Sequence, residues 1–447
     1  IRRNPKVSQP PVRHALTGVI DLYPISRVLS HYSGYNAPPA GSPGKLTSAC
    51  GYTFYRDSLF DGLVEPSIYF SCPVHNCVHR EVITWNGVLM QTARASDEAR
   101  SEFVRSSDSW FRPTGIRTGP DGGMYVADMY RLVIEHPEWI DDKLEREMIA
   151  DGRLRAGHDR GRIYKVFPTG AKLHKPARLA GRKPAELAAA LDSPNGWQRD
   201  TAHMMMTWLA RGEQQKAIPA LVKVLRSKHP AARAQATSAL ADLGALSAMA
   251  MKIGLDDSHP GVRRNALRVG AHVLNNDAAL GQRAVSLLDD EDAHVQRQAA
   301  YALGAWKDPR AGQALGRFLV KNAERPYLRA AALTSAGAFP DEVLLAVLGM
   351  NRTPVTSALS TELMGMLGED AKKFVPRVLA RIAAKPANGQ HYEAWKLIAA
   401  TRLLEAVGED ASVRAKVAPM LAGARAIVDD GQAELANRLA AVQLVER

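Results

Sequence analysis

The segment Thr118-Gly-Pro-Asp-Gly-Gly-Met-Tyr-Val-Ala-Asp128 decides the fold of the first third of the chain. Its Pro-Asp-Gly-Gly run predicts a tight turn, because these residue types tolerate turn backbone geometry. The apolar run Met124–Ala127 that follows predicts a β-strand. Turn-then-strand units of this kind are typical of β-propeller blades. The segment therefore predicts an antiparallel β domain.

Short strand-like runs with turn signals between them lie on both sides of this segment. They fall at residues 53–55, 67–70, 78–85, 88–92, 116–118 and 161–166. Asn86-Gly87 joins two of them and predicts a hairpin, because a tight primed turn needs positive φ. A whole propeller needs more strands than residues 1–167 supply. We therefore expect the last blades of a β-propeller, with a helix inserted at about 138–150 and earlier blades missing before Ile1.

A basic, proline-containing linker is predicted at 168–183, and from residue 184 the chain takes a helical period that repeats. Comparable units begin at Pro194, Pro230, Pro260, Ala293 and Pro326, at spacings of 36, 30, 33 and 33 residues. A Pro in the first turn, an Arg soon after and a Gly at the end mark one helix of a two-helix repeat. The pattern resembles HEAT repeats and predicts an α-solenoid over 184–447, an architecture commonly used as a scaffold.

Composition places the chain among ordinary water-soluble proteins of two or three domains. It has 447 residues, 46% of them hydrophobic, and no apolar run near the ~18 residues that a membrane helix needs. The net charge of +12 is concentrated in residues 169–447, which hold 37 Lys and Arg against 27 Asp and Glu. Because the arginines recur at repeat positions, nucleic-acid binding is not favoured. We expect them to pair with acidic residues of neighbouring repeats, namely Asp242, Asp256, Asp257 and Asp289.

Three cysteines, Cys50, Cys72 and Cys77, lie in the first fifth of the chain. The run Ser71-Cys-Pro-Val-His-Asn-Cys-Val-His-Arg80 has Cys and His at spacings that zinc could use, but zinc ligands normally come as pairs from two separate knuckles. A Cys50–Cys72 disulfide, with Cys77 as a packed thiol, is the favoured prediction. The zinc site stays open as the alternative.

Several polar residues fall near the expected strand ends, where propeller blades present side chains to a central site. Asp108 and Asp128 could bind Ca²⁺, although Asp128 is more simply read as the cap of its own turn. A histidine beside a carboxylate and an arginine could form a general base next to an anion clamp. The residues concerned are His79, Trp110, Arg112, Tyr130, Arg131, Glu135, His136, His158, Asp159 and Arg160.

At these residues the chain resembles a known family. The motifs are Trp110-Phe-Arg-Pro, Gly119-Pro-Asp-Gly, Asp128-Met-Tyr-Arg, Ile134-Glu-His-Pro-Glu-Trp, Gly157-His-Asp-Arg-Gly-Arg-Ile-Tyr and Asp192-Ser-Pro-Asn-Gly-Trp-Gln-Arg-Asp200, together with Thr47-Ser-Ala-Cys, Pro73-Val-His-Asn and Val78-His-Arg. They are similar to the planctomycete and verrucomicrobial membrane-bound dehydrogenases, also described as haem-binding Cys-x-x-Cys-His proteins. Members join a glucose/sorbosone dehydrogenase-like propeller to HEAT repeats.

The resemblance implies an extracytoplasmic, periplasmic protein that oxidises a sugar or alcohol. It implies PQQ and calcium as cofactors, and haem c only in a domain outside this chain. His136 or His79 would act as base, and Arg112, Arg131 and Arg160 as clamps. Cofactor-binding candidates are Arg112, Trp110, Tyr130 and Asp159, and Asp128 and Asp108 are the calcium candidates. The solenoid would bind a protein partner or the protein's own cytochrome domain. The alternative is a non-enzymatic propeller and solenoid module for protein interaction.

Overall fold

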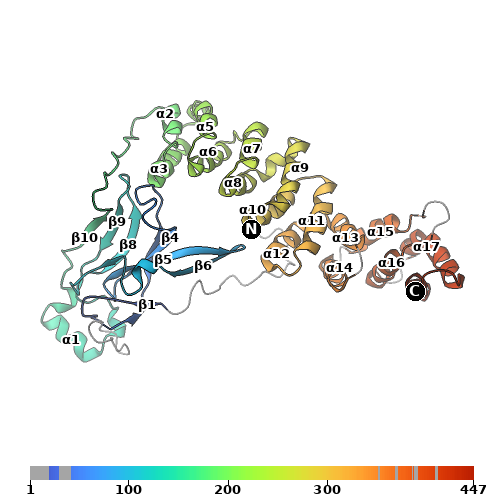
Figure 1. Cartoon of the computed structure of the whole chain (residues 1–447), viewed down its shortest axis with the longest axis horizontal. Coiled ribbons are helices and arrows are strands. Elements are labelled where there is room, and N and C mark those ends of the chain that lie inside the picture. The colour runs from blue at the N-terminus through green and yellow to red at the C-terminus, as the bar shows by residue number, and fades with distance from the viewer. Residues whose placement is uncertain are drawn as a thin grey trace. The chain divides into compact units, whose positions relative to one another are not determined.

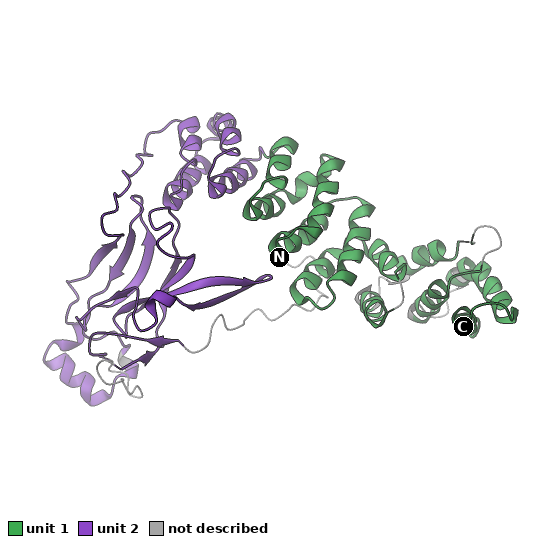
Figure 2. Cartoon of the chain, viewed as in Figure 1, with its two compact units in different colours: residues 1–12, 246–447 green, residues 13–245 purple. Residues whose placement is uncertain are grey.

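The computed structural model describes residues 20–29, 42–350, 353–367, 371–384, 386, 391–407 and 411–447. The chain divides into two compact units (Figure 2). Unit 2 is Arg13–Ala245, and the described part of unit 1 is Leu246–Arg447. Each unit is considered by itself. Among the described residues, no helix combines the length and the apolar character needed to cross a membrane.

The first part of unit 2 is antiparallel β-structure (Figure 1). Its strands are β1 (Asp21–Leu22), β2 (Gly44–Lys45), β3 (Cys50–Phe54), β4 (Ser67–Cys72), β5 (Cys77–Asn86), β6 (Leu89–Arg94), β7 (Val104–Arg105), β8 (Pro113–Thr118), β9 (Met124–Asp128) and β10 (Arg162–Val166). They form a two-stranded sheet β1-β2, a sheet β3-β4-β5-β6 with β7 beside β5, and a sheet β8-β9-β10. These sheets of the described region are open, so the antiparallel β domain is confirmed while the closed propeller is not shown.

The Asn86-Gly87 hairpin is present, with its turn one residue later than the sequence suggests. Asn86 pairs with Leu89 as the last residue of β5, so the turn consists of Gly87 and Val88. Gly87 has φ 59°, whereas Asn86 is not among the positive-φ residues of the described chain. A glycine with positive φ at the first turn position is the geometry of a type II′ hairpin, which explains the shift.

The two larger sheets pack against each other through their apolar faces. Tyr69 and Val78 of the first sheet meet Ile116, Met124 and Val126 of the second in one buried cluster with Phe111. The alternation of strand residues sends every second side chain to this face. The inserted helix α1 (Asp142–Ala150) begins after Asp141, whose carboxylate accepts from two amides of the first turn.

Unit 2 continues into helices. They are α2 (Pro184–Ala189), α3 (Gly196–Thr207), α4 (Arg211–Gln215), α5 (Ile218–Val224) and α6 (Pro230–Asp242). Asp57 in the β region joins the strands of unit 2 to its helices. Its carboxylate accepts from His174 Nε2 at 2.9 Å and from the side chain of Asn195, the residue that caps α3. Arg56 adds a bidentate ion pair to Asp200 of α3 at 2.5 and 3.0 Å. The segment predicted as a linker is therefore held against the β-structure.

Unit 1 is helical throughout its regular elements. They are α7 (Ala248–Leu255), α8 (Pro260–Gly270), α9 (Ala278–Ser286), α10 (Ala293–Leu303), α11 (Pro309–Lys321), α12 (Pro326–Ala336), α13 (Pro340–Leu348), α14 (Pro354–Leu367), α15 (Ala371–Ile382), α16 (Ala394–Val407), α17 (Ala411–Asp429) and α18 (Leu435–Val445). Short 3₁₀ turns in the chain are η1 (Ser96–Glu98), η2 (Pro137–Trp139), η3 (Arg153–Arg155), η4 (Ala271–Asn275) and η5 (Leu287–Asp289).

The helices of unit 1 stack as a solenoid. Helices α8, α10 and α12 pack side by side in one layer, and α11 packs on α13 in the other (Figure 1). The predicted repeat starts Pro260, Ala293 and Pro326 are the first residues of α8, α10 and α12. The predicted α-solenoid is confirmed.

Candidate functional site

Arg112, expected to clamp a cofactor, is buried, and its guanidinium is held by backbone oxygens. Its guanidinium donates to the backbone oxygens of Arg131 at 3.0 Å, Pro73 at 2.8 Å, Leu29 at 3.2 Å and Leu132 at 2.9 Å. Burial, opposed by nearby acidic groups, lowers its pKa to about 10. A side chain that is 0% exposed and uses four of its five donors on the backbone is a structural cross-link.

Asp128 caps a turn, as the simpler of the two sequence interpretations has it. Its Oδ1 accepts from the backbone amides of Arg112 at 2.7 Å and Tyr130 at 2.8 Å. Tyr130 has φ 51°, a left-handed geometry that this carboxylate helps to hold. Asp108, the other calcium candidate, similarly accepts from the amide of Trp110 at 2.9 Å.

The aromatic candidates do lie together. The rings of Trp110 and Tyr130 are 5.8 Å apart, and the guanidinium of Arg162 lies 3.8 Å from the Tyr130 ring centroid. A hydrogen bond to Asp108 raises the pKa of Tyr130. Trp110 and Tyr130 are half-buried, whereas Arg162 is exposed and is a member that the sequence interpretation missed. Strand register brings it there, since Arg162 is the strand partner of Asp128, and the sequence carried no signal for this pairing.

The remaining candidates make local contacts. His136 lies 3.8 Å from Glu138 and Arg160 lies 3.9 Å from Asp159, and all four side chains are well exposed. Arg131 donates to the backbone oxygen of Arg155 at 3.0 Å. Each is engaged by a close sequence neighbour or by backbone.

His79, the alternative base, is buried between two carboxylates. Its Nδ1 lies 2.7 Å from Glu102 Oε2 and its Nε2 lies 3.0 Å from Glu81 Oε1. Arg94 pairs with the other oxygen of Glu102 at 3.0 Å. Burial lowers the pKa of His79, but the hydrogen bonds to Glu102 and Glu81 outweigh it, and the pKa is raised overall. Both ring nitrogens are occupied and the ring is 0% exposed, so it is not open to a substrate.

The predicted Cys50–Cys72 disulfide is wrong for this structure, in which all three cysteines are free. Strand register is the reason. Cys50 is the partner of Ser71, whereas Cys72 is the partner of Cys77. Opposite residues project to the same face of a sheet, so Cys50 and Cys72 face away from each other. The zinc alternative also lacks support, since the described residues contain no group of three or more ligands placed to hold a metal.

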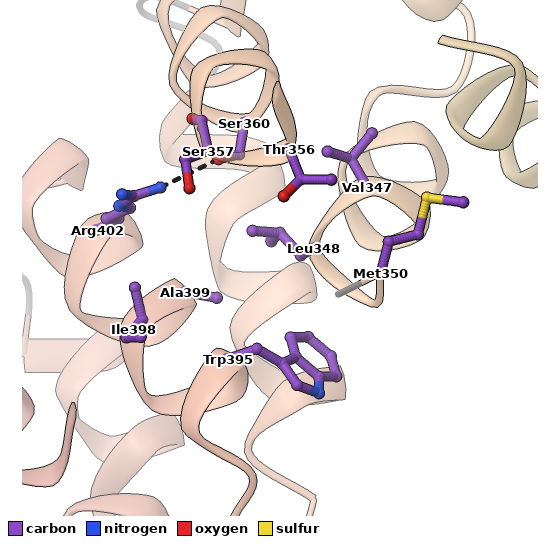
Figure 3. A pocket seen from close by; sticks show the side chains of 10 residues that line it. All are labelled: Val347, Leu348, Met350, Thr356, Ser357, Ser360, Trp395, Ile398, Ala399 and Arg402. Carbon is purple, nitrogen blue, oxygen red and sulfur yellow. Dashed lines mark hydrogen bonds between the residues drawn. The ribbon is translucent and has the colours of Figure 1, made fainter. Parts of the chain in front are cut away.

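A small pocket lies in unit 1 between α13, α14 and α16 (Figure 3). Val347, Trp395 and Ile398 give it an apolar wall, and Arg402 donates to Ser360 Oγ at 3.2 Å. No sequence-predicted site residue lines it.

The arginines at the repeat position serve the solenoid itself. Arg199, Arg233 and Arg263 each donate to a backbone oxygen six residues earlier, in the loop before their own helix. Arg263 also makes a bidentate pair with Asp290 of the next repeat at 2.7 and 2.8 Å.

The expected pairing of arginines with acidic residues of neighbouring repeats is confirmed for Asp256, whereas the other three aspartates have different partners. Asp256 binds Arg283 at 2.7 Å, Asp289 binds Lys321 at 2.5 Å, and Asp242 lies 3.1 Å from His203. The carboxylate of Asp257 instead accepts from the backbone amide of His259 at 2.8 Å. Part of the basic excess that suggested a polyanion partner is therefore used within the fold.

One face of unit 1 keeps basic side chains without carboxylate partners in the described structure. Arg264 of α8 and Arg297 of α10 occupy equivalent places, 33 residues apart, on two helices that pack side by side. Arg268 and Tyr301 are the next equivalent pair, one turn further on. Burial lowers the pKa of Arg297; nearby Tyr301 and Tyr327 oppose this, and the positive charge of Arg264 adds to it. We call Arg264, Arg268, Arg297, Tyr301 and Tyr327 the basic-aromatic face.

A second exposed surface lies on α3 in unit 2. Trp197, Met204 and Trp208 are 38%, 43% and 73% exposed. Their spacing of seven and eleven residues places them on one stripe of the helix. Large apolar side chains gathered in this way mark a contact surface more often than isolated ones do.

Comparison with known proteins supports the solenoid and leaves the β region without a described function. Residues 1–170 match the model "Domain of unknown function (DUF7133)". Residues 247–337 and 281–354 match the model for HEAT repeats, so this part of the chain consists of HEAT repeats.

Among curated proteins, the chain is similar to a phycobilisome maturation protein of Synechococcus elongatus, with 35% identity over 128 residues. The match covers 28% of this chain and 59% of that protein's length. Among solved structures, it is similar to the complex of CpcE and CpcF of phycocyanin lyase from Nostoc sp. PCC7120, at 17% identity over 61% of this chain and 97% of that one, with a TM-score of 0.23. An engineered protein matches at 15% identity over 59% and 96%, with the same TM-score.

These findings correct the expected function. The curated relative is a maturation protein and not a sugar or alcohol dehydrogenase. The residues assigned to catalysis are buried in the fold, as Arg112 is, or engaged by close neighbours, as His136 is. The interaction-module alternative is favoured instead. The family resemblance, the periplasmic location and the cofactors PQQ, calcium and haem c stay predictions.

Proposed function

We propose that this chain is a protein-interaction module whose HEAT solenoid binds an acidic segment of a partner protein. The observation that carries the proposal is the basic-aromatic face of α8, α10 and α12. Elsewhere in unit 1 several basic side chains pair across repeats, as Arg283 does with Asp256. On this face Arg264 and Arg297 lie close enough to repel each other, and no carboxylate of the described residues relieves them.

The composition of the face supports a protein partner. Arginine and tyrosine are enriched where protein interfaces concentrate their binding energy, because both offer a large planar surface and directed hydrogen bonds. Arginine also binds carboxylates in a bidentate way. Bringing two like charges together costs free energy that an acidic segment would recover on binding. The curated relative, a maturation protein, is consistent with work done on another protein.

The β region would add a second platform. We propose that its two larger sheets are propeller blades, on the support of the β3-β4-β5-β6 meander and the face-to-face packing of this sheet with β8-β9-β10. The stripe of Trp197, Met204 and Trp208 offers this unit an apolar contact.

The test uses the full chain and fluorescent poly-glutamate, with binding followed by anisotropy at low and physiological salt. The double variant Arg264→Glu/Arg297→Glu is expected to lose at least about tenfold in affinity, since each reversal removes an attraction worth about 1 kcal/mol and adds a repulsion. Lys223→Glu/Arg317→Glu is the matched control, because it changes the net charge equally at exposed residues of α5 and α11.

Equal losses in both double variants would mean that binding follows net charge alone, and the proposal would fail. A DNA duplex that binds more tightly than poly-glutamate, and is lost in the Arg264→Glu/Arg297→Glu variant, would assign the face to nucleic acid instead.

A further inference from the structure

The end of the β4–β5 hairpin holds two cysteines directly opposite each other. Cys72 is the last residue of β4, Cys77 is the first of β5, and they are strand partners. Residues directly opposite on antiparallel strands have Cβ atoms about 4.5–5.5 Å apart, only slightly beyond the roughly 3.5–4.5 Å of a disulfide. The register therefore brings the two thiols within reach of a bond after a small movement.

Both side chains point into the same buried cluster. Cys72 and Cys77 are 0% exposed and pack with Leu22, flanked by Ile20 and Leu46. The two sulfurs interact, because a hydrogen bond with Cys77 is the main cause that holds the pKa of Cys72 well below its ordinary value. The same interaction, together with burial, raises the pKa of Cys77. The pair is thus asymmetric, with Cys72 as the better nucleophile.

The turn between the cysteines is built to hold them in place. Asn76 has φ 54°, and its side chain donates to the backbone oxygens of Ser109 at 3.0 Å and Phe111 at 2.5 Å. Its oxygen accepts from Ser26 at 2.8 Å. His75 in the same turn places Nδ1 3.3 Å from the sulfur of Cys72. A turn anchored from several sides fixes the register on which bond formation depends.

We propose that Cys72 and Cys77 are a dithiol pair that closes into an intra-hairpin disulfide on reaction with a small organic disulfide. The thiolate of Cys72 attacks one sulfur of the reagent, forming a mixed disulfide and releasing one thiol. The thiolate of Cys77 then attacks the sulfur of Cys72 and releases the second thiol. The two cysteines lose two electrons and two protons, and the reagent is reduced to two thiols.

Cys50 is excluded from this reaction. It pairs with Ser71 on the other face of the sheet, and its sulfur lies 3.8 Å from the backbone oxygen of Pro113. It has no part in the bond between Cys72 and Cys77, so the variant Cys50→Ser is a control that leaves the pair intact.

The experiment equilibrates the full chain with oxidised and reduced glutathione at a series of ratios. Mild urea is included so that the buried Cys72 and Cys77 become accessible to glutathione. Mass spectrometry of the alkylated intact chain and its peptides reads out the products. Wild type and Cys50→Ser are both expected to lose about 2 Da, from a bond between Cys72 and Cys77. Cys77→Ser is expected to stop at the mixed disulfide on Cys72, with circular dichroism as the check that it is folded.

Three results would overturn the proposal. One is a Cys50–Cys72 cross-link, and another is loss of the reaction in Cys50→Ser. The third is a pair that stays reduced at the most oxidising ratio while the same conditions form glutathione adducts at Cys50.

Discussion

The backbone amide of Arg112 donates to Asp128 Oδ1 at 2.7 Å, which joins the start of β8 to the end of β9. Around this bond the Arg112 guanidinium holds the backbone of three separate segments through Leu29, Pro73 and Leu132. The arrangement has the properties of a structural corner.

Replacing Arg112 with Met is expected to destabilise the β region by about 3 kcal/mol or more. The substitution leaves four backbone oxygens without their donor, and an unsatisfied buried group costs about 1–3 kcal/mol. Chemical unfolding followed by circular dichroism measures the loss. Arg160→Met, at an exposed residue, should stay within about 0.5 kcal/mol of wild type. Equal stability of the two variants would show that the corner is not structural.

Asp128→Asn should be far milder than Asp128→Ala. Asn keeps an oxygen that accepts from the amides of Arg112 and Tyr130, whereas Ala leaves both without a partner, at about 1–2 kcal/mol. Thermal unfolding with calcium or with a chelator provides the second measurement. A melting temperature of the wild type that rises with calcium, and does not in Asp128→Ala, would return Asp128 to the role of a metal ligand.

His79 should make the β region less stable as pH rises. Its pKa is raised in the folded state, so the stabilisation by its protonated form is fully present below the unfolded pKa of about 6.5 and is lost as pH rises through the folded pKa. His79→Gln is expected to be less stable at pH 6 and to lose this decline, while His136→Gln, at an exposed ring, keeps it. Urea unfolding at a series of pH values decides the question. An unchanged decline in His79→Gln would assign it to other groups.

The pair of Arg263 and Asp290 should contribute strongly to the solenoid. Both side chains are less than 10% exposed, and removal of one partner leaves a buried charge, at about 3–5 kcal/mol. Arg263→Met and Asp290→Asn should each destabilise, and the double variant should cost less than their sum in a double-mutant cycle. Arg310→Met is the control, because Arg310 pairs at the surface with its neighbour Asp308. Additive losses would mean that the two residues act independently.

Gly281 of α9 lies under the ring of Trp306, where a Cβ would come within 2.0 Å of the ring. Gly281→Ala should therefore cost about 1–3 kcal/mol through overpacking. Gly365→Ala in α14 meets nothing within 4 Å and should be neutral or stabilising by up to about 1 kcal/mol. Thermal unfolding of the two variants compares the effect of one added methyl group at a tightly packed position with its effect at an unoccupied one. A neutral Gly281→Ala would show that the repeats can separate to admit a methyl group.

The sequence by itself determined the elements and their repetition. The Pro-Asp-Gly-Gly turn, the Asn86-Gly87 hairpin and the helix starts at Pro260 and Pro326 follow from preferences that act over a few residues, and the structure has them. The 33-residue spacing also sufficed for the solenoid, because each repeat packs on its neighbours in sequence.

Only the tertiary structure decided the role of the polar side chains. Arg112 looked like a clamp because its partners lie as far as 83 residues away in sequence and are backbone oxygens, which leave no residue-type signal. Cys72 looked like a partner for Cys50 until strand register set it opposite Cys77. Strand register and long-range burial arise from the packing of whole strands. A shift of the strand pairing by one residue changes which side chains meet, and local composition does not encode that shift.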